Sequence, residues 1–489
     1  MRVYKDLHDY LNELEQLNLL THIQEELSPV LEIPALIVEA VRRGIGTLLF
    51  ENVKEYPGWK VVGNLFGDWR YIKLLFGENP EDIGRRILDL LKVPYGGFIE
   101  KLSLLKDVTR LGKYFPKETR SKSYRVEYVG EEVDLNIIPV FKTWPGDAGK
   151  FFTYPLVISR DPEHEIYNIG VYRIQVVGRN EALMHWQAHK RGSITEKIYR
   201  ERGLTKFPVA VAIGGDPILL FSGACPTPRG IDEYLFAGLL RGEGVKVFKS
   251  EYSGLYIPAY AEAVLEGYID LTDYRLEGPF GDHMGYYTPQ EYYPVLKVER
   301  ILLRRDPIYY GTVVGKPPME DGYIGKAIER IFLPFIRMIF PEIVDINLPI
   351  HGLFHGLAVV SIKKRYPGHA KKVMLGLWGL GQFSLNKILI VVDSDVDVHD
   401  LNQVIYAISS TVDPKRDVVI IPYTHTDALD HTVSMPLIGS KMGIDATRKY
   451  REELGREWPK EIEGYPDDVM RKILSLIHIS EPTRPLYIS

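Results

Sequence analysis

The middle of this chain has a different kind of sequence from its two ends. Between about Tyr124 and Tyr310, short runs rich in β-branched and aromatic residues are broken by glycine and proline, whereas helical and strand-like patterns alternate on either side. Short strands at this spacing favour a barrel or an open β-domain, and alternating helices and strands favour α/β lobes. We therefore predict a mixed α/β and β fold, with an N-terminal α/β lobe at 1–122, a β-rich centre at 123–318 and a C-terminal α/β domain at 319–474.

Apolar spacing predicts the individual elements. Helices are expected at 3–20, 34–43, 70–76, 81–91, 232–240, 259–265, 325–340, 370–380 and 398–409. Strands are expected at 47–50, 60–62, 124–128, 156–159, 169–177, 209–213, 295–302, 358–363, 388–392 and 417–421. The last residues, 475–489, depart from the helical pattern that precedes them, and we predict that they are a non-native tail without function.

Composition excludes several classes of function. The 60 basic and 65 acidic residues give a net charge of -5, and no basic run is interleaved with aromatics, so nucleic acid is not an expected partner. Cys225 is the only cysteine, which excludes disulfides within the chain and cysteine-based zinc sites and suits a reducing cytoplasm. The N-terminus lacks a signal-peptide core, and the most apolar helical segment, 331–340, is too short to span a bilayer. A cytoplasmic protein without a transmembrane segment is expected, with peripheral membrane association as a second option.

One glycine-rich stretch places two carboxylates five residues apart. It reads Glu277-Gly-Pro-Phe-Gly-Asp282-His283-Met284-Gly285, and its glycines and proline cannot propagate a helix or a regular strand. A shaped loop of this kind can aim both carboxylates into one cavity, where one is expected to stay protonated while the other is ionised. The alternative is a polar surface turn.

Three other segments carry groups of the same kind. Arg173 lies in the run Asn168-Ile-Gly-Val-Tyr172-Arg173 of an expected strand, where period-two alternation places Arg173 on the face opposite Tyr172. The run His185-Trp-Gln-Ala-His-Lys-Arg-Gly192 is dense in groups that hold anions, and Glu233 falls in the first turn of an expected helix. Taken singly, Arg173 could be a solvated charge on a strand, the run from His185 to Gly192 a polar connector loop, and Glu233 a carboxylate favoured by the helix dipole.

Taken together, these segments resemble the UbiD family of decarboxylases, which use prenylated FMN. The resemblance covers the chain to about residue 474. It rests on motifs in the family's order: Trp144-Pro-Gly-Asp147, Asn168-x-Gly-x-Tyr-Arg173, Glu233-Tyr-x-Phe-Ala-Gly-Leu-Leu-Arg-Gly242, Glu277-Gly-Pro-x-Gly-Asp282, Gly315-Lys-Pro-Pro318 and Gly439-Ser-Lys-Met-Gly443. It implies an N-terminal α/β lobe, a central split β-barrel like that of flavin reductases, and a C-terminal α/β domain that mediates oligomerisation.

The resemblance also implies roles for individual residues. The catalytic trio would be Arg173, Glu277 and Asp282. The metal ligands would be Asn168, Glu233 and His189, a set suited to Mn²⁺ or Mg²⁺, and K⁺ is a further ion that the resemblance admits. Prenylated FMN would be lined by Val171, Tyr172, Arg173, His185, Trp186, Gln187, Lys190, Arg191, Gly192 and Lys387. Either Lys190 or Arg191 would bind the phosphate, because this loop is one residue longer than in the bacterial ubiquinone-pathway members.

The implied chemistry is the reversible, non-oxidative loss of CO₂ from an aromatic or α,β-unsaturated acid. Such a loss leaves a carbanion that needs an electron sink, which the flavin supplies. Arg173 is expected to pair with Glu277 and to position the substrate carboxylate, and Asp282 is expected to be the acid that reprotonates carbon. The segment from His425 to His431 is expected to close over the substrate, with a second metal site as its alternative.

Two substrates and two other classes of protein remain open. The first substrate is 4-hydroxy-3-polyprenylbenzoate of quinone synthesis, for which the apolar segments 331–340 and 375–380 offer surface for a prenyl tail. The second is trans-anhydromevalonate 5-phosphate of the archaeal isoprenoid pathway, with Lys190, Arg191 and Lys441 as candidate phosphate ligands. A flavin prenyltransferase would supply the cofactor, and a homo-oligomer, dimer or hexamer, is expected. A split-barrel flavin reductase and a flavin carrier are the rival readings.

Overall fold

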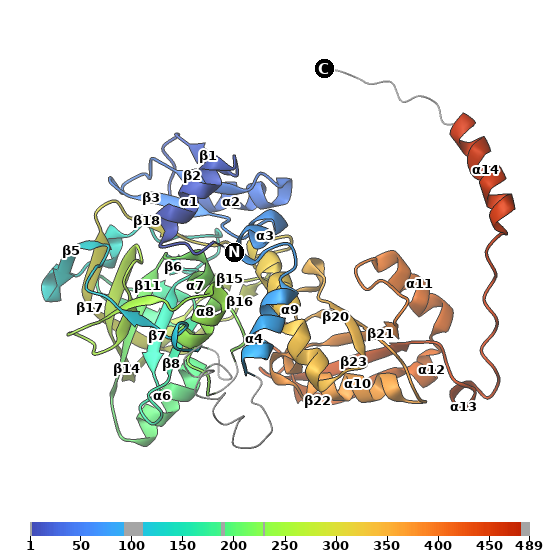
Figure 1. Ribbon diagram of the computed structural model, residues 1–489. Helices are drawn as coiled ribbons and strands as arrows, with labels where there is room; N and C mark the ends of the chain where they lie inside the picture. Colours follow the sequence, from blue (N-terminus) through green and yellow to red (C-terminus); the bar gives the residue numbers. More distant parts are fainter. Residues whose placement is uncertain (1, 92–110, 187–190, 228–229, 481–489) are drawn as a thin grey trace, which may run out of the picture. The chain divides into compact units, whose positions relative to one another are not determined.

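The computed structural model describes residues 2–91, 111–186, 191–227 and 230–480 (Figure 1). The chain divides into two compact units, which are described separately. The larger unit comprises residues 1–364 and 369–447, and the smaller comprises 365–368 and 448–489. Among the described helices, none is both long enough and apolar enough to cross a membrane.

The N-terminal part of the larger unit is a four-stranded sheet in the order β1-β2-β3-β18. Its strands are β1 (Leu20–Ile23), β2 (Thr47–Phe50), β3 (Lys60–Gly63) and β18 (Ile308–Tyr310). Its helices are α1 (Leu7–Gln16), α2 (Glu32–Arg43), α3 (Trp69–Phe76) and α4 (Glu81–Leu91). Alternate strand residues face different cores: Leu49 and Val62 pack with α1 and α3, and Phe50 and Val61 pack with α2. The sheet is therefore covered by helices on both faces.

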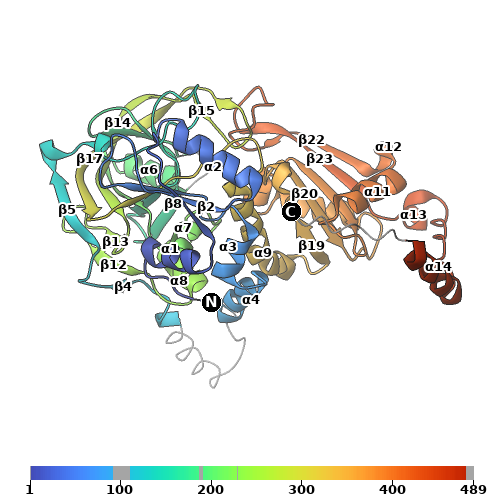
Figure 2. The same ribbon diagram turned by 90° about the horizontal axis from the view of Figure 1, so that it is seen from above.

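The centre is a curled half-barrel sheet of nine strands, seen from two directions in Figures 1 and 2. Its order is β6-β9-β10-β17-β14-β11-β7-β8, with β5 paired to β17. The strands are β5 (Tyr124–Val129), β6 (Phe151–Phe152), β7 (Leu156–Arg160), β8 (Tyr167–Val171), β9 (Ile174–Val176), β10 (Glu181–Met184), β11 (Lys206–Ile213), β14 (Ala263–Glu277) and β17 (Glu291–Arg304). The long pair β14–β17 contains register shifts at Glu266/Gly267 and Asp270/Tyr274, and such bulges let a long antiparallel pair bend and twist.

Shorter elements complete the centre. The helices are α6 (Arg191–Glu201), α7 (Pro217–Ser222) and α8 (Glu233–Arg241). A three-stranded sheet has the order β13-β12-β4, with β4 (Lys117–Glu118), β12 (Lys246–Lys249) and β13 (Tyr256–Pro258). A two-stranded ribbon joins β15 (Phe280–Gly281) to β16 (Tyr287–Thr288).

The C-terminal part of the larger unit is a five-stranded sheet in the order β19-β20-β21-β23-β22. Its strands are β19 (Ile343–Asn347), β20 (Leu357–Ile362), β21 (Ile388–Asp393), β22 (Val418–His425) and β23 (Ile438–Ala446). Its helices are α9 (Glu320–Ile339), α10 (His369–Trp378), α11 (Leu401–Thr411) and α12 (Pro414–Asp417). The core residues Val360 and Val391 pack with α10, and their strand neighbours Val359 and Val392 pack with α11, so these helices cover opposite faces.

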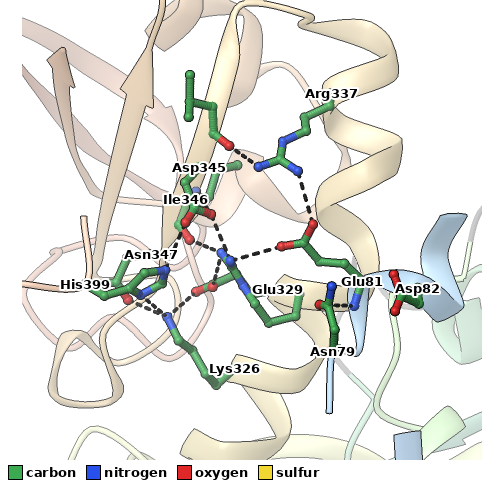
Figure 3. A network of polar contacts seen from close by, with 12 residues as sticks. Asn79, Glu81, Asp82, Lys326, Glu329, Arg337, Asp345, Ile346, Asn347 and His399 are labelled. Carbon is green, nitrogen blue, oxygen red and sulfur yellow. Dashed lines mark hydrogen bonds and ion pairs between the residues drawn. The ribbon is translucent and has the colours of Figure 1, made fainter. Parts of the chain in front are cut away.

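Helix α9 is joined to the N-terminal lobe by a charged network (Figure 3). The Glu81 carboxylate at the start of α4 lies 3.4 Å from Arg330 and 3.1 Å from Arg337. Arg330 also lies 2.8 Å from Asp345 in the middle of β19. Because Arg330 is shared between carboxylates of two elements, the network ties α9 to both α4 and the C-terminal sheet.

The smaller unit contains α13 (Arg451–Leu454) and α14 (Asp467–Ser480). The amide of Gly368 donates a 2.8 Å hydrogen bond to Glu453. Helix α14 extends through Ser480, so the predicted break in helical structure at 475 is wrong. Whether 475–489 are native stays a prediction.

The predicted mixed α/β and β fold class is confirmed, with corrections to individual elements. The helix expected at 259–265 is instead the start of strand β14, because a short apolar run does not by itself distinguish helix from strand. The strand expected at 169–177 is interrupted at Tyr172 and Arg173, between β8 and β9. The elements that were not predicted include strands β1, β10, β19 and β23 and helices α6 and α7.

Candidate active site

Arg173 lies at the break between β8 and β9 and bridges the two carboxylates of the glycine-rich loop. Its Nε and Nη2 atoms donate to Glu277 at 2.7 and 2.9 Å, and its Nη1 donates to Asp282 at 2.7 Å. Nη2 also donates to the Thr288 hydroxyl at 3.2 Å, and the guanidinium lies over the Phe280 ring, 4.7 Å from its centroid. Arg173 and Asp282 are each 9% exposed and Glu277 is fully buried, so this network is shielded from bulk water.

Side chains from neighbouring strands hold the loop in place. Glu277 ends β14, and the amide of the next residue, Gly278, donates to the Gln175 side chain on β9 at 2.8 Å. The buried Asp147 accepts 2.8 Å hydrogen bonds from the amides of Gly281 and Trp144. The carboxylate of the Trp-Pro-Gly-Asp motif thus connects its own turn to the loop that carries Glu277 and Asp282.

Gly281 is required by its close approach to Trp144. A Cβ atom at this position would lie 2.3 Å from Trp144 Cδ1. We expect Gly281→Ala to displace the loop and to cost about 1–3 kcal/mol of unfolding free energy, the range typical of overpacking. Chemical denaturation would measure this cost, with Gly203→Ala, which is next to open space at φ +72, as a control for backbone strain alone. A Gly281→Ala protein as stable as the wild type would contradict the prediction.

Both loop carboxyls are ionised in this arrangement, which corrects the expectation that one stays protonated. Burial alone would raise the pKa of Glu277, but the hydrogen bond from His185 and the charge of Arg173 outweigh it and bring the pKa to about 2. Burial is likewise outweighed at Asp282, where His283 and Arg173 hold the pKa well below its usual range. The two carboxylates do not share one proton because a guanidinium lies between them.

His185 lies next to the same network. Its Nδ1 is 3.3 Å from Glu277, and its ring lies against Tyr293 at a tilt of 35°, with centroids 4.2 Å apart. Burial and the charge of Arg173 lower the pKa of His185, which favours a neutral imidazole. His185 therefore acts as a hydrogen-bond donor to Glu277 in this arrangement.

A second cluster contains the predicted metal ligands Asn168 and Glu233. Glu233, the first residue of α8, accepts a short hydrogen bond from the amide of Ile169, which places it next to Asn168 on β8. Arg191 Nη1 lies 3.3 Å from Glu233. The amide of Gly192 donates to the Tyr172 hydroxyl at 3.2 Å. The structure thus brings together five of the predicted metal- and cofactor-binding residues.

The remaining predicted site residues fall in three groups. Trp186 is buried edge-on to Tyr172, with ring centroids 5.8 Å apart, and Val171 is partly buried at the end of β8. Lys387 lies in the C-terminal part, where its ammonium is 3.0 Å from Asp430. Gln187, His189 and Lys190 lie outside the described residues.

A cavity of about 320 Å³ opens beside Arg173. From the central part it is lined by Arg173, His185, Asp282, Met284, Tyr286, Tyr287, Thr288, Pro289, Glu291 and Tyr293. Its other wall is the segment after β22, comprising Ala428, Leu429, Asp430, His431, Val433, Ser434 and Pro436. The His431 ring lies against Tyr286 at a tilt of 39°, with centroids 4.1 Å apart. Residues 428–431 of the His425 to His431 segment line the cavity, and its closure over the substrate stays a prediction.

The structure supports neither the apolar segments as a surface for a prenyl tail nor Lys441 as a ligand for a substrate phosphate. None of the residues lining the cavity comes from the apolar segments 331–340 and 375–380, and Ile331, Leu333 and Leu377 are buried core residues. Lys441 is buried and donates to the carbonyls of Ser384 and Asn386 at 2.6 and 2.8 Å, so it caps a turn within the C-terminal part.

Three functional candidates were missed from sequence. The Thr288 hydroxyl accepts from Arg173, and the Gln175 side chain accepts from the amide of Gly278, next to Glu277. Gln175 is two residues from Arg173, a spacing that could have identified it. His283 follows Asp282 directly and contacts its carboxylate at 3.0 Å. Its place inside the glycine-rich loop was the available signal.

Profiles of one family match almost the whole chain. They are described as the N-terminal, Rift-related and C-terminal domains of 3-octaprenyl-4-hydroxybenzoate carboxy-lyase, and they match residues 11–91, 117–317 and 322–446. An uncharacterized protein of Aeropyrum pernix is 49% identical over 96% of this chain and 97% of its own length. One of Archaeoglobus fulgidus is 49% identical over 94% of this chain and 95% of its own length.

Solved structures agree with the family match. The closed form of vanillic acid decarboxylase from Sedimentibacter hydroxybenzoicus is similar with a TM-score of 0.85 and 28% identity, covering 99% of this chain and 100% of that one. Its open form gives a TM-score of 0.78 at 27% identity, covering 98% and 99%. An evolved dimeric form of HmfF from Pelotomaculum thermopropionicum, in complex with prFMN, gives 0.77 at 26% identity, covering 95% and 98%. The chain belongs to the UbiD family of carboxy-lyases.

Proposed function

We propose that this chain is a reversible, non-oxidative decarboxylase of an aromatic or α,β-unsaturated carboxylic acid that works with prenylated FMN. The observation that carries the proposal is the buried bridge of Arg173 between Glu277 and Asp282 at the edge of the cavity. A guanidinium with two carboxylates offers both an anchor for an acid and groups that move a proton.

The residues present fit a flavin phosphate held through a divalent ion. Asn168 and Glu233 offer oxygen ligands, which Mn²⁺ and Mg²⁺ prefer, and Arg191 and the Gly192 amide offer donors for a phosphate. His189 and Lys190 are proposed to complete this set, with K⁺ as a further ion. When bound, the prenylated flavin supplies the electron sink that a departing CO₂ requires.

The protein's own groups then position the acid and move a proton. Arg173 anchors the substrate carboxylate while it keeps Glu277 ionised. Asp282 lines the cavity with its carboxylate aimed at Arg173, so it is placed to exchange a proton with the substrate. His185 orients Glu277, and the wall from Ala428 to Pro436 excludes water.

Glu233→Ala is expected to lose the metal and most of the cofactor together with activity. The reason is that, without the divalent cation that Glu233 would hold, the flavin phosphate would face an incomplete set of donors. Metal analysis and flavin absorbance of the purified protein would measure both losses, and Glu201→Ala, an exposed carboxylate at the end of α6, is the control. Full flavin occupancy in Glu233→Ala would contradict this role.

The substrate has two candidates. 4-Hydroxy-3-polyprenylbenzoate remains the first, supported by motif similarity and by a cavity lined with Tyr286, Tyr287 and Tyr293, whose rings suit an aromatic acid. Trans-anhydromevalonate 5-phosphate is the second, and it would need a cation for its phosphate beyond those that hold the flavin. Turnover of the phosphorylated acid with none of the benzoate would overturn the first choice and leave the decarboxylase assignment intact.

Two partners are proposed. A flavin prenyltransferase would supply the cofactor, and a second copy of the chain would form a dimer or a hexamer through the C-terminal α/β domain. Native mass spectrometry of the purified protein would give the assembly size, and a monomer at micromolar concentration would contradict it. Coexpression with a flavin prenyltransferase, followed by the mass of the bound flavin, tests the cofactor; full activity with ordinary FMN would overturn it.

A further inference from the structure

The glycine-rich loop holds a second titratable group, His283, which lies beside Asp282 and has no role in the chemistry proposed above. The backbone amide and Nδ1 of His283 both contact Oδ1 of Asp282, at 2.7 and 3.0 Å. The other oxygen, Oδ2, accepts from Arg173 at 2.7 Å. The Asp282 carboxylate is therefore held at both of its oxygens, at Oδ2 by the Arg173 guanidinium and at Oδ1 by the His283 imidazole and amide.

The imidazole is enclosed. The side chain of His283 is only 12% exposed, and its ring is 6.0 Å from the Phe354 ring. Its Nε2 atom is buried and has no hydrogen-bond partner among the described residues. A buried ring nitrogen without a partner is costly in a purely structural histidine, so this position calls for a functional account.

Two carboxylates on other elements act on this ring through their charge. Asp321 lies in the first turn of α9, next to the buried Glu320, and Asp427 directly precedes the segment that forms the far wall of the cavity. The guanidinium of Arg173 is joined to the ring through Asp282. Acidic groups on three elements therefore favour the protonated form of the ring.

The charges give the direction of titration. Burial would lower the pKa of His283, but the hydrogen bond and charge of Asp282, followed by Asp427 and Asp321, raise it to about 9. Burial raises the pKa of Asp321 to about 7, against the opposing charge of His283. At neutral pH the pair Asp282–His283 therefore holds one proton, and it is on the imidazole.

We propose that His283 is a positioning residue that fixes Asp282 and stores the proton which the decarboxylation consumes. This inference rests on the proposed function, and it assigns the proton source within that site. Replacement of CO₂ by hydrogen takes up one proton for each CO₂ released. His283 Nδ1 gives its proton to Asp282, and Asp282 gives a proton to the carbon, whose electron pair from the broken C–CO₂ bond forms the new C–H bond. The neutral imidazole then regains a proton from water.

His283→Asn separates the fixing of Asp282 from the storage of the proton. The asparagine amide can donate to Asp282 from nearly the position of Nδ1 but carries no proton to transfer. We expect unchanged flavin occupancy, a substrate KM within about twofold of wild type, and a kcat lower by about 10². Solvent deuterium incorporation into the decarboxylated product, measured without CO₂, is expected to fall by a similar factor.

The matched control is His164→Asn. His164 is paired with Asp161 at 3.3 Å, but this pair is on the surface and does not line the cavity. The control is expected to leave kcat and deuterium incorporation unchanged. A His283→Asn enzyme with wild-type kcat and wild-type deuterium incorporation would overturn the proposal.

A second measurement does not require turnover. In protein with ¹³C-labelled histidine, the signal lost in His283→Asn identifies His283, and its titration should give a pKa of about 9, above the ordinary histidine value of 6.5. Asp321→Asn removes a facing carboxylate and should move the His283 midpoint to lower pH. A His283 signal that is neutral at pH 7 would overturn the inference even if the chain is a decarboxylase. A charged His283 in a protein that decarboxylates neither candidate acid would instead count against the proposed function.

Discussion

Arg173→Lys is expected to lose about 10³-fold in kcat/KM. The guanidinium makes three charged hydrogen bonds in two directions, to Glu277 and to Asp282. A lysine ammonium is a point charge and cannot bridge both carboxylates in a planar geometry. One carboxylate would stay buried without a partner, and its pKa would rise.

Arg300→Lys is the matched control for this change. Arg300 on β17 also joins two carboxylates, Glu127 at 2.7 Å and Glu266 at 3.0 Å, but it does not line the cavity. Both substitutions are expected to lower the melting temperature, and only Arg173→Lys is expected to lower turnover. Equal turnover in the two variants would show that Arg173 has only a structural role.

Glu277→Gln and Asp282→Asn are each expected to fold, to bind flavin and to lose about 10² to 10⁴ in kcat, the usual contribution of a positioned proton-transfer group. Both amides keep the size of the side chain and remove its charge. The measurement is steady-state decarboxylation of whichever acid is turned over, with Glu127→Gln, the partly exposed partner of Arg300, as control. Near-normal kcat in either variant would contradict a catalytic role for this loop.

The ion pair of Glu277 with Arg173 predicts how the free energy of unfolding depends on pH. The folded-state pKa of Glu277 is lowered to about 2, below its ordinary value of 4.5. Its ion pair therefore stabilises the fold fully above pH 4.5, and that stabilisation is lost as the pH falls toward 2. Denaturant unfolding between pH 5 and pH 3 should show a smaller loss of stability in Glu277→Gln than in the wild type.

The glycine-rich loop was found from the sequence because its residue pattern is local. Its glycines, with two carboxylates among them, indicated a shaped loop. Asp282 does line the cavity, and the fully buried Glu277 is joined to Asp282 through Arg173. The predicted division of protons between them is wrong because Arg173 was expected to pair with Glu277 alone, whereas it also donates to Asp282. The partner that decides their charge, Arg173, is more than a hundred residues away in sequence.

Other features depended on tertiary pairing that a single sequence does not display. Strand β23 carries a motif with two glycines, which hide its alternation, and it is recognised as a strand by its parallel pairing with β21 and its antiparallel pairing with β22. Arg173 points inward although the strand expected around it is interrupted. The domain boundaries at 122/123 and 318/319, and the roles of Gln187, His189 and Lys190, stay predictions.

Release of CO₂ by the reconstituted protein tests the central claim most directly. The chain, coexpressed with a flavin prenyltransferase and supplied with Mn²⁺, should release labelled CO₂ from one of the two carboxyl-labelled candidate acids, and Arg173→Lys should not. The same preparation should not oxidise NADH. Flavin-dependent NADH oxidation, with no label released from either acid, would contradict the assignment and favour a reductase.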